Sequence, residues 1–450
     1  MDKKDQLLAK ADQPGVEAMK LHPFYKGKIE VVPKACIRDF QDFAIWYTPG
    51  VAKPCLDINK NPETVWEHTN KGNLVAVITD GTRVLGLGDI GPEASLPVME
   101  GKAMLFKYLG GIDVFPIALD TKDPDKIIET VLLLQPAFGG INLEDIAQPK
   151  CFRILDELRK KARIPVWHDD QQGTATVTVA GFINALRVVD KKIDQVRVAM
   201  VGAGASNYRI AKLLFTAGVN PKNVIMTDSK GTLHLGRTEL QKDYPEKWEI
   251  CQVSNVNQVK GGIPEAMKGA DAVIALSTPG PGIIKKEWVK MMEQNAIVFA
   301  CANPTPEIWP WEAKEAGARV VATGRSDFPN QVNNSLGFPG IFRGTLDVAA
   351  KTITDEMCIA ASYELAQLAL ENGLHENCIL PTMDDWQVFP REAAAVGMKA
   401  IEQGVARKVL TREEMLKMAS ERITRARSLT RSMMDTGFIE IPHRYVMTGD

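Results

Sequence analysis

Short apolar runs alternate with amphipathic, helix-like stretches along the first three quarters of the chain. In the first series, strand-like runs at 73–80, 113–119 and 138–143 are interleaved with helix-like segments at 98–109 and 123–134. Because helices connect successive strands when those strands run parallel, the pattern predicts a parallel sheet with helices on its faces.

A second series of the same kind begins near residue 196. It opens with "VRVAMVGAGAS", which we interpret as a buried strand that enters a glycine-rich turn, and the helix-like "YRIAKLLFTAGV" follows. Further strand-like runs lie at 223–228, 271–277, 296–304 and 319–326. A strand, a glycine-rich turn and a helix in this order are typical of a Rossmann-type domain.

Beyond about residue 345 the chain lacks strand-like runs and has a helical period at 345–370, 391–405 and 411–429. We therefore predict an α/β protein with three parts. These are an N-terminal domain of parallel strands and helices at 1–165, a Rossmann-type dinucleotide-binding domain at 166–345, and a helical segment at 346–450 that packs on the core.

Length and charge narrow the class of protein. A chain of 450 residues is too long for one hydrophobic core, and its net charge of −2 argues against nucleic-acid binding. No apolar run reaches the length of a transmembrane helix, and the polar start lacks a signal-peptide core. The seven cysteines form no CxxC motif, which fits a reducing compartment. We expect a cytoplasmic protein without nucleic-acid or membrane partners.

Two acidic pairs stand where strand-like runs end. Glu144 and Asp145 follow one run, and Asp169 and Asp170 follow another in "IPVWHDDQQGTA". Adjacent carboxylates repel one another unless they are solvated or a cation neutralises them. Glu144, Asp145 and Asp170 could give three oxygen ligands to Mg²⁺ or Mn²⁺. Each acid alone fits a solvated strand end or a helix cap, but both pairs together favour a metal. We expect the neighbouring His168 to be a packing residue.

The glycine-rich turn "VGAGASN" predicts a pyrophosphate site. Gly202 permits a tight turn, and Gly204 lets the backbone approach a phosphate at the start of the next helix. Asn207 stands where a third glycine is usual, which weakens the motif, and a strand–helix turn without a ligand is the alternative interpretation. The candidate cofactor residues of this turn are Gly202, Gly204, Ala205, Ser206 and Asn207.

Asp228 ends the strand that follows the turn and its helix. An acid there can accept hydrogen bonds from an adenosine ribose, which favours NAD. Lys230 lies two residues further on, and a cation can tolerate the 2′-phosphate of NADP. The sequence therefore leaves the choice between NAD and NADP open.

Five further residues are candidates for substrate chemistry. Lys102 is predicted at a helix start, where a lysine is normally a solvated charge; beside a metal its pKa could fall, and it could act as a base. Tyr47, on a turn, is either a packing residue or a proton donor. Arg83, in a glycine-rich segment with the further candidate Asp89, is a candidate site residue. Asn303 and Asn334 follow strand-like runs, where an asparagine either makes a turn or holds a carboxylate or a carboxamide.

With these residues in place, the chain resembles a malic enzyme of the small-subunit prokaryotic type. The resemblance extends from about Lys26 into the helical tail. It rests on "YTPGVA", "TDGTRVLGLGDIGP", "PVMEGK", "FGGINLEDI", "HDDQQGTA", "VGAGAS" and "NPTPE", which occur in the order of the family. The resemblance implies oxidative decarboxylation of L-malate to pyruvate and CO₂, with NAD⁺ or NADP⁺ and with Mg²⁺ or Mn²⁺.

The resemblance also implies roles for the candidate residues. Tyr47 matches the general acid of the family, Lys102 its general base, and Asp169 the acid paired with that lysine. The remaining matches are Arg83 for the substrate carboxylate, Glu144, Asp145 and Asp170 for the metal, and Asn303 and Asn334 beside substrate and nicotinamide. Relatives form dimers in which the N-terminal region packs against the partner, so we expect a homodimer or a higher homo-oligomer. Some relatives continue into a phosphotransacetylase-like domain, for which we expect this chain to be too short.

Two other functions stay open on the sequence alone. A metal-dependent oxaloacetate decarboxylase without net redox chemistry would use the acids and Lys102, but would leave the glycine-rich turn without a purpose. A nucleotide-binding regulatory protein would use the turn, but not the acids clustered with Lys102 and Tyr47.

Overall fold

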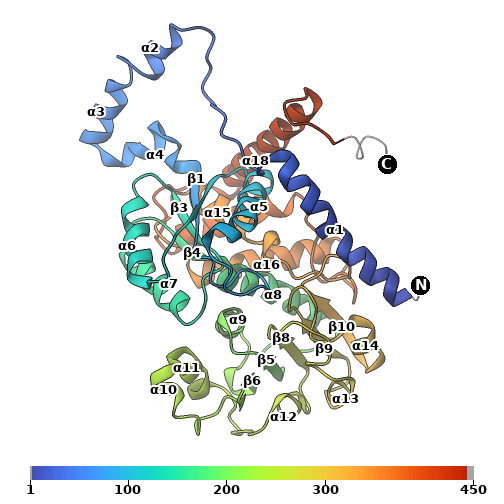
Figure 1. The fold of residues 1–450 in the computed structure, drawn as a ribbon. Coiled ribbons are helices and arrows are strands. Elements are labelled where there is room, and N and C mark those ends of the chain that lie inside the picture. The colour runs from blue at the N-terminus through green and yellow to red at the C-terminus, as the bar shows by residue number, and fades with distance from the viewer. Residues whose placement is uncertain (1–2, 443–450) are drawn as a thin grey trace.

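The computed structural model describes residues 3–442, and its strands form two separate sheets (Figure 1). The first sheet has the order β2-β1-β3-β4, and all of its strands are parallel. Its strands are β1 (Leu74–Thr79), β2 (Asp113–Ala118), β3 (Gly140–Leu143) and β4 (Val166–His168). The predicted parallel sheet of the N-terminal domain is confirmed.

Strand β1 is central to this sheet and is apolar on both faces, as a strand covered by helices requires. Val75 and Val77 face one core cluster together with Met99 of helix α5 (Pro92–Gly110). Ala76 and Ile78 face the other cluster, which α6 (Pro124–Leu134) and α7 (Lys150–Lys161) complete. The continuous apolar run in the sequence therefore reflects burial from both sides.

The second sheet has the order β10-β9-β8-β5-β6-β7, and only β7 runs antiparallel. Its strands are β5 (Val198–Val201), β6 (Val224–Asp228), β7 (Gly231–Thr232), β8 (Ala272–Ala275), β9 (Ala296–Ala300) and β10 (Ala318–Thr323). From β5 the chain adds β6 and β7 on one side of the sheet and then β8, β9 and β10 on the other side. The point at which the direction of winding changes therefore lies between β5 and β8. Open parallel sheets bind ligands outside the carboxyl ends of their strands at such a point.

The helical segment is confirmed, and it packs on the rest of the molecule. Its helices are α15 (Phe338–Asp347), α16 (Asp355–Glu371), α17 (Val388–Glu402) and α18 (Arg412–Asp435). α18 packs against α5 of the first domain, and α16 packs against α8 (Asp169–Val188), which in turn packs against α9 (Ala205–Thr216) of the second domain. Within residues 3–442, no helix has both the length and the apolarity needed to cross a membrane.

Two predicted boundaries differ from the structure. The predicted second domain began at residue 166, but β4 (Val166–His168) pairs with β3 in the first sheet. A strand of three residues has too little pattern to show which sheet it joins. Helix α5 begins at Pro92, so Lys102 lies inside the helix rather than at its start. Pro92 occupies the first turn, where its missing N–H costs nothing.

The N-terminal arm leads from its first helix to two short helices that lie away from the two sheets (Figure 1). Helix α1 (Lys3–Tyr25) is followed by a strand-free segment at 26–41, which leads to α2 (Asp42–Trp46) and α3 (Ala52–Lys60). Figure 1 shows α2 and α3 far from the body of the molecule. Several of the arm's large apolar side chains are at least half exposed, namely Val31, Phe40, Ile45, Trp46, Tyr47 and Leu56. Large exposed apolar side chains are typical of interaction surfaces.

A buried ion-pair network ties the helical segment to the first domain. The fully buried Arg343 guanidinium donates to Asp347 from Nε at 3.0 Å and to Asn73 from Nη1 at 2.6 Å. Arg422 of α18 lies 2.7 Å from the same Asp347 carboxylate. Asp347 is therefore the shared anion for two arginines from different helices.

Replacing Asp347 tests this network. Asp347→Asn keeps the shape but leaves the buried Arg343 without a counter-charge, so unfolding should become easier by about 3–5 kcal/mol. Chemical denaturation with guanidinium measures this change. Glu315→Gln removes one partner of the exposed ion pair with Lys286 and should cost less than about 1 kcal/mol. Equal effects of the two substitutions would show that the Asp347 network does not hold the parts together.

Candidate active site

The two acidic pairs meet at the carboxyl ends of β3 and β4. Leu143 pairs with His168 in the parallel register, which places the residues that follow each strand side by side. Asp145 adopts a positive φ of 55°, and its backbone N–H donates to the Asp170 carboxylate at 2.9 Å. One carboxylate oxygen each from Glu144, Asp145 and Asp170 lies within 4.8 Å of the other two. The structure thus gathers the three predicted metal ligands at one point.

Burial makes this cluster electrostatically costly without a cation. Burial and the neighbouring acids raise the pKa of Glu144 well above its usual range, although Lys102 opposes the shift. Burial and then the Asp170 charge raise the pKa of Asp145 to about 8. One buried oxygen of Asp145, Oδ2, has no hydrogen-bond partner. Three hard oxygen donors with one orphaned oxygen fit a divalent cation such as Mg²⁺ or Mn²⁺.

Lys102 reaches this cluster from helix α5. Its Nζ donates to Asp169 Oδ2 at 2.6 Å and lies 3.0 Å from Glu144 Oε1. The ammonium also sits 4.4 Å from the ring centre of Phe338, at the start of α15. Burial alone would lower the pKa of Lys102, but Asp169 and Glu144 more than offset it, so the pKa is raised. Without a metal, the lysine is therefore held as an ammonium ion.

Asp169 is itself locked in position. It is fully buried, and Trp167 donates to its Oδ1 from Nε1 at 3.2 Å. A β-carbon added to Gly173, one turn along α8, would lie 2.0 Å from the same oxygen. Only glycine fits there, which explains why a residue unfavourable to helices stands near the start of α8.

Arg83 and Asn334 lie next to this centre, and Asn303 lies beside the loop that carries Arg83. Arg83 has an exposed side chain, and its backbone N–H donates to the Asp145 carbonyl at 2.9 Å. A β-carbon on Gly86, in the same loop, would lie 2.7 Å from the Asn303 carbonyl oxygen, so the loops after β1 and β9 touch. The Asn334 β-carbon would lie 3.2 Å from a β-carbon on Gly173. Asp89, the other candidate of the loop, pairs instead with Lys122.

Tyr47 is the one predicted catalytic residue that the chain does not bring to this centre. It ends α2 in the N-terminal arm, and its side chain is 71% exposed. Figure 1 shows α2 away from the ends of β3 and β4. Sequence order could not reveal this separation, because the arm's orientation depends on contacts that no local pattern records.

The glycine-rich turn lies directly beside the acidic cluster. Gly202 has a φ of 98°, and a β-carbon there would lie 2.6 Å from the Leu276 carbonyl oxygen, so glycine is required. A β-carbon on Gly204 would make only an ordinary contact, with Gln148 Nε2 at 4.0 Å. Ser206, in the first turn of α9, donates its hydroxyl to the Asp170 carbonyl at 2.8 Å. The predicted nucleotide loop and the predicted metal ligand are therefore joined by a hydrogen bond.

Asn207 has a structural role in place of the missing third glycine. Its side-chain amide donates to the carbonyl of Val201 at 2.9 Å and to that of Gly202 at 2.8 Å. The side chain is fully buried and holds the turn in place through these two hydrogen bonds. The departure from the usual glycine pattern is therefore compensated by two hydrogen bonds.

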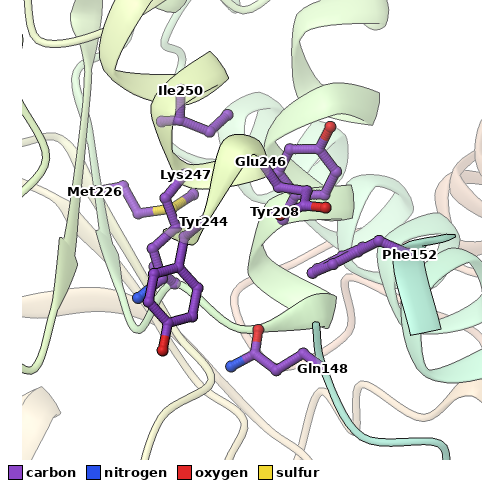
Figure 2. Close-up of a pocket in the computed structure, with 9 residues that line it drawn as sticks. Gln148, Phe152, Tyr208, Met226, Tyr244, Glu246, Lys247 and Ile250 are labelled. Atoms are coloured by element: carbon purple, nitrogen blue, oxygen red, sulfur yellow. The ribbon is translucent and has the colours of Figure 1, made fainter. Parts of the chain in front are cut away.

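Asp228 ends β6 as predicted, but it has partners that the sequence did not suggest. Arg237 contacts both of its oxygens at 3.2 Å, and Lys247 donates to one of them at 3.0 Å. Lys247 also lines a small cavity with Tyr244 and Gln148, next to Ala203 of the glycine-rich turn (Figure 2). These two cations were missed because they lie 9 and 19 residues from Asp228 in the sequence.

Glu307 and His168 were not predicted to be site residues. The fully buried Glu307 accepts hydrogen bonds from the backbone N–H groups of Ser277 at 2.8 Å and Ala302 at 3.1 Å, so it joins the loops after β8 and β9. His168 is also fully buried, burial lowers its pKa, and its Nδ1 lies 3.6 Å from Asp170. The sequence motif "NPTPE" contains Glu307, but the motif alone does not show that this glutamate joins two loops.

The fold and the site together define a two-sheet α/β protein with a dinucleotide-type loop beside an acidic, metal-type centre. Family models of the malic enzyme N-terminal domain and of the malic enzyme NAD binding domain match residues 26–159 and 171–403. The chain belongs to the malic enzyme family.

Individual relatives agree with this assignment. The chain is 51% identical to the bifunctional malic/malolactic enzyme of Bacillus subtilis strain 168, over 89% of this chain and 96% of that protein. It is 49% identical to the NAD-dependent malic enzyme of Geobacillus stearothermophilus, over 85% of this chain and 78% of that one. Other relatives are named NADP-dependent. The crystal structure of the Entamoeba histolytica malic enzyme matches with a TM-score of 0.95 and 50% identity, over 98% of this chain and 92% of that one.

The metal-type centre can be tested without turnover. Asp170→Asn removes one negative ligand, so Mn²⁺ binding should weaken by at least about tenfold, the lower end of what even an outer-shell change costs. Titration followed by the electron paramagnetic resonance of free Mn²⁺ measures this. Asp120→Asn, at the exposed end of β2 in the same sheet, should bind Mn²⁺ like the unsubstituted protein. Unchanged affinity in Asp170→Asn would remove this residue from the metal site.

Proposed function

We propose that this protein catalyses the oxidative decarboxylation of L-malate to pyruvate and CO₂, with reduction of NAD⁺ or NADP⁺, and that it requires Mg²⁺ or Mn²⁺. One observation carries the proposal: Lys102 lies between Asp169 and Glu144, beside the metal-type carboxylates and next to the nucleotide-type loop. This arrangement supports a general base next to a cation site and a nucleotide site. Membership of the malic enzyme family supports the same reaction.

The cation supplies a Lewis acid for the enolate that forms when CO₂ leaves, and the nicotinamide supplies the hydride acceptor. Lys102 takes the proton of the malate C2 hydroxyl. If Glu144 held the metal, it would neutralise the Lys102 ammonium less, and the pKa of the lysine would fall toward that of a usable base. Asp169 keeps the amine aligned. Arg83 and the asparagines at 303 and 334 orient the substrate carboxylate and the carboxamide.

The last step requires a proton donor to the enolate carbon, and Tyr47 is the proposed donor. Because one chain holds Tyr47 on an exposed arm, we propose that a second copy of this chain brings its Tyr47 to Lys102. The arm's exposed apolar residues give a surface for such a contact. The proposed assembly is a homodimer or a higher homo-oligomer, and the proposed location is a reducing cytoplasm, as the cysteine pattern favours.

An oxaloacetate decarboxylase without redox chemistry is not favoured. It has no use for a nucleotide-type loop that is bonded to the Asp170 backbone through Ser206. The discriminating experiment mixes protein, L-malate and Mn²⁺ with either nicotinamide nucleotide and follows reduced nicotinamide and pyruvate together. Both products in equal amounts support the proposal. Pyruvate from oxaloacetate alone, without oxidation of malate, contradicts it.

Removing the lysine tests its assignment as the base. Lys102→Met should lower the turnover of malate by roughly 10²–10⁴-fold, because general-base catalysis is lost. Binding of reduced nicotinamide, followed by its fluorescence, should survive. Lys107→Met, on the same helix but paired with Asp113 away from the acidic centre, is the matched control and should retain turnover. More than a tenth of wild-type turnover in Lys102→Met would assign the proton to another group.

Mixing two inactive variants tests the shared site. Lys102→Met and Tyr47→Phe should each be inactive, but a hybrid dimer should contain one site with both residues intact. After exchange of subunits in an equal mixture, roughly a quarter of wild-type activity should return, as random pairing in a two-fold dimer requires. Absence of recovered activity, with hybrids demonstrated by native mass spectrometry, would place both residues in the same chain.

A further inference from the structure

The carboxylate of Asp228 stands where an acid can bind the adenosine ribose, but its hydrogen-bonding capacity is already used. Its Oδ1 accepts from the Lys230 backbone N–H at 2.9 Å and from Arg237 at 3.2 Å. Its Oδ2 accepts from Arg237 at 3.2 Å and from Lys247 at 3.0 Å. A carboxylate offers about four lone-pair positions, so little capacity is left for a ribose diol.

The carboxylate is also held firmly in this state. The Asp228 side chain is 6% exposed, against 11% for Arg237 and 17% for Lys247. Burial would raise the pKa of Asp228, but the hydrogen bonds from Arg237 and Lys247 lower it overall, so the carboxylate stays ionised. Releasing the acid to a ribose would require the breaking of charge-assisted hydrogen bonds, which are stronger than those between neutral groups.

Cations outnumber anions around this acid. Arg237 also pairs with Glu239 through Nε. Lys230, which is exposed, Ser229 and His234 line an open pocket with Arg237 at the turn between β6 and β7. This pocket is lined by the cations Lys230 and Arg237, and none of its lining residues carries a carboxylate.

These cations keep unused donors. A guanidinium has five N–H groups and an ammonium has three, so Arg237 and Lys247 can bind a second anion while they hold Asp228. Lys247 lies toward the glycine-rich turn, because it lines the same cavity as Ala203, with Tyr244 beside it (Figure 2). Arg237 and Lys230 lie toward the outer pocket. An anion bound beside Asp228 would thus meet positive charge from both sides.

We infer that the nucleotide site prefers NADP over NAD, and that Lys230, Arg237 and Lys247 bind the 2′-phosphate of its adenosine ribose. Asp228 is then a positioning residue, which holds two of these cations rather than a ribose. This inference rests on the proposed use of a nicotinamide nucleotide. Asp228 considered alone favours NAD. The inference reverses that preference because Arg237 and Lys247, which are distant from Asp228 in the sequence, neutralise its carboxylate in the fold.

Two fragments of the cofactor test the inference without catalysis. Adenosine 2′,5′-bisphosphate and adenosine 5′-monophosphate differ only in the 2′-phosphate, and calorimetry gives the affinity of each. The wild-type protein should bind the bisphosphate at least about tenfold more tightly, since one charge-assisted hydrogen bond of about 1.5 kcal/mol already corresponds to that factor. Arg237→Gln and Lys247→Gln should each lose most of this advantage, while the affinity for the monophosphate should stay the same.

Lys230→Gln and Lys242→Gln complete the test. Lys230 is exposed, so its substitution leaves the Asp228 network in place and should still reduce the advantage of the bisphosphate. Lys242 is an exposed lysine of the short helix α10 (Leu240–Asp243) and is the matched control that should leave the advantage unchanged. In turnover, kcat/KM for NADP⁺ should fall about tenfold or more in Arg237→Gln, with a smaller change for NAD⁺.

Other outcomes overturn the inference in recognisable ways. Equal affinity of the wild-type protein for the two fragments contradicts it. A second contrary outcome combines two results. Arg237→Gln and Lys247→Gln would lower the thermal stability, and Lys230→Gln would keep the full affinity advantage of the bisphosphate over the monophosphate. The three side chains would then form an ion-pair network that stabilises the fold only. Absence of malate oxidation with both cofactors would instead refute the proposed function, and the fragment comparison would still decide the 2′-phosphate question.

Discussion

The site depends on one buried ammonium ion. Lys102 carries a positive charge into a region where Asp169 and Glu144 are almost fully buried, and its contacts at 2.6 and 3.0 Å are short enough to hold both. The ammonium ion or either carboxylate, if buried alone, would carry a large desolvation cost. The interaction also joins three parts of the chain, because α5 supplies the lysine, β3 leads to the glutamate and α8 begins with the aspartate. The same geometry that stabilises these ion pairs places a lysine beside a metal-type centre.

Coupling between the domains follows from this arrangement. Asp169 and Asp170 start α8, which packs on the helix of the nucleotide loop and on the helical segment. Ser206 bonds to the backbone of Asp170, and Asn207 fixes the turn itself. A displacement of the nucleotide loop would therefore act directly on the backbone of Asp170, which is a metal-type ligand and the neighbour of Asp169, the partner of Lys102.

Much of the fold and the centre could be predicted because the signals are local. Apolar strands covered on both faces and acids directly after them are visible in the sequence, and parallel strands bring their ends together. The features that the sequence could not predict depend on tertiary contacts. Three residues of β4 do not show which sheet they join, and Arg237 and Lys247 reach Asp228 only through the fold. Tyr47 matches the family in sequence, yet the fold holds it on the exposed N-terminal arm, away from this centre.

The most direct test of the central claim follows the hydrogen at C2 of malate. With L-malate deuterated at C2, Mn²⁺ and the oxidised nucleotide, the reduced nicotinamide should carry the deuterium, and one pyruvate should appear for each reduced nicotinamide. Mass spectrometry of both products measures this. Pyruvate formed without deuterium on the nicotinamide, or reduced nicotinamide formed without pyruvate, would contradict a single centre that performs both halves of the reaction.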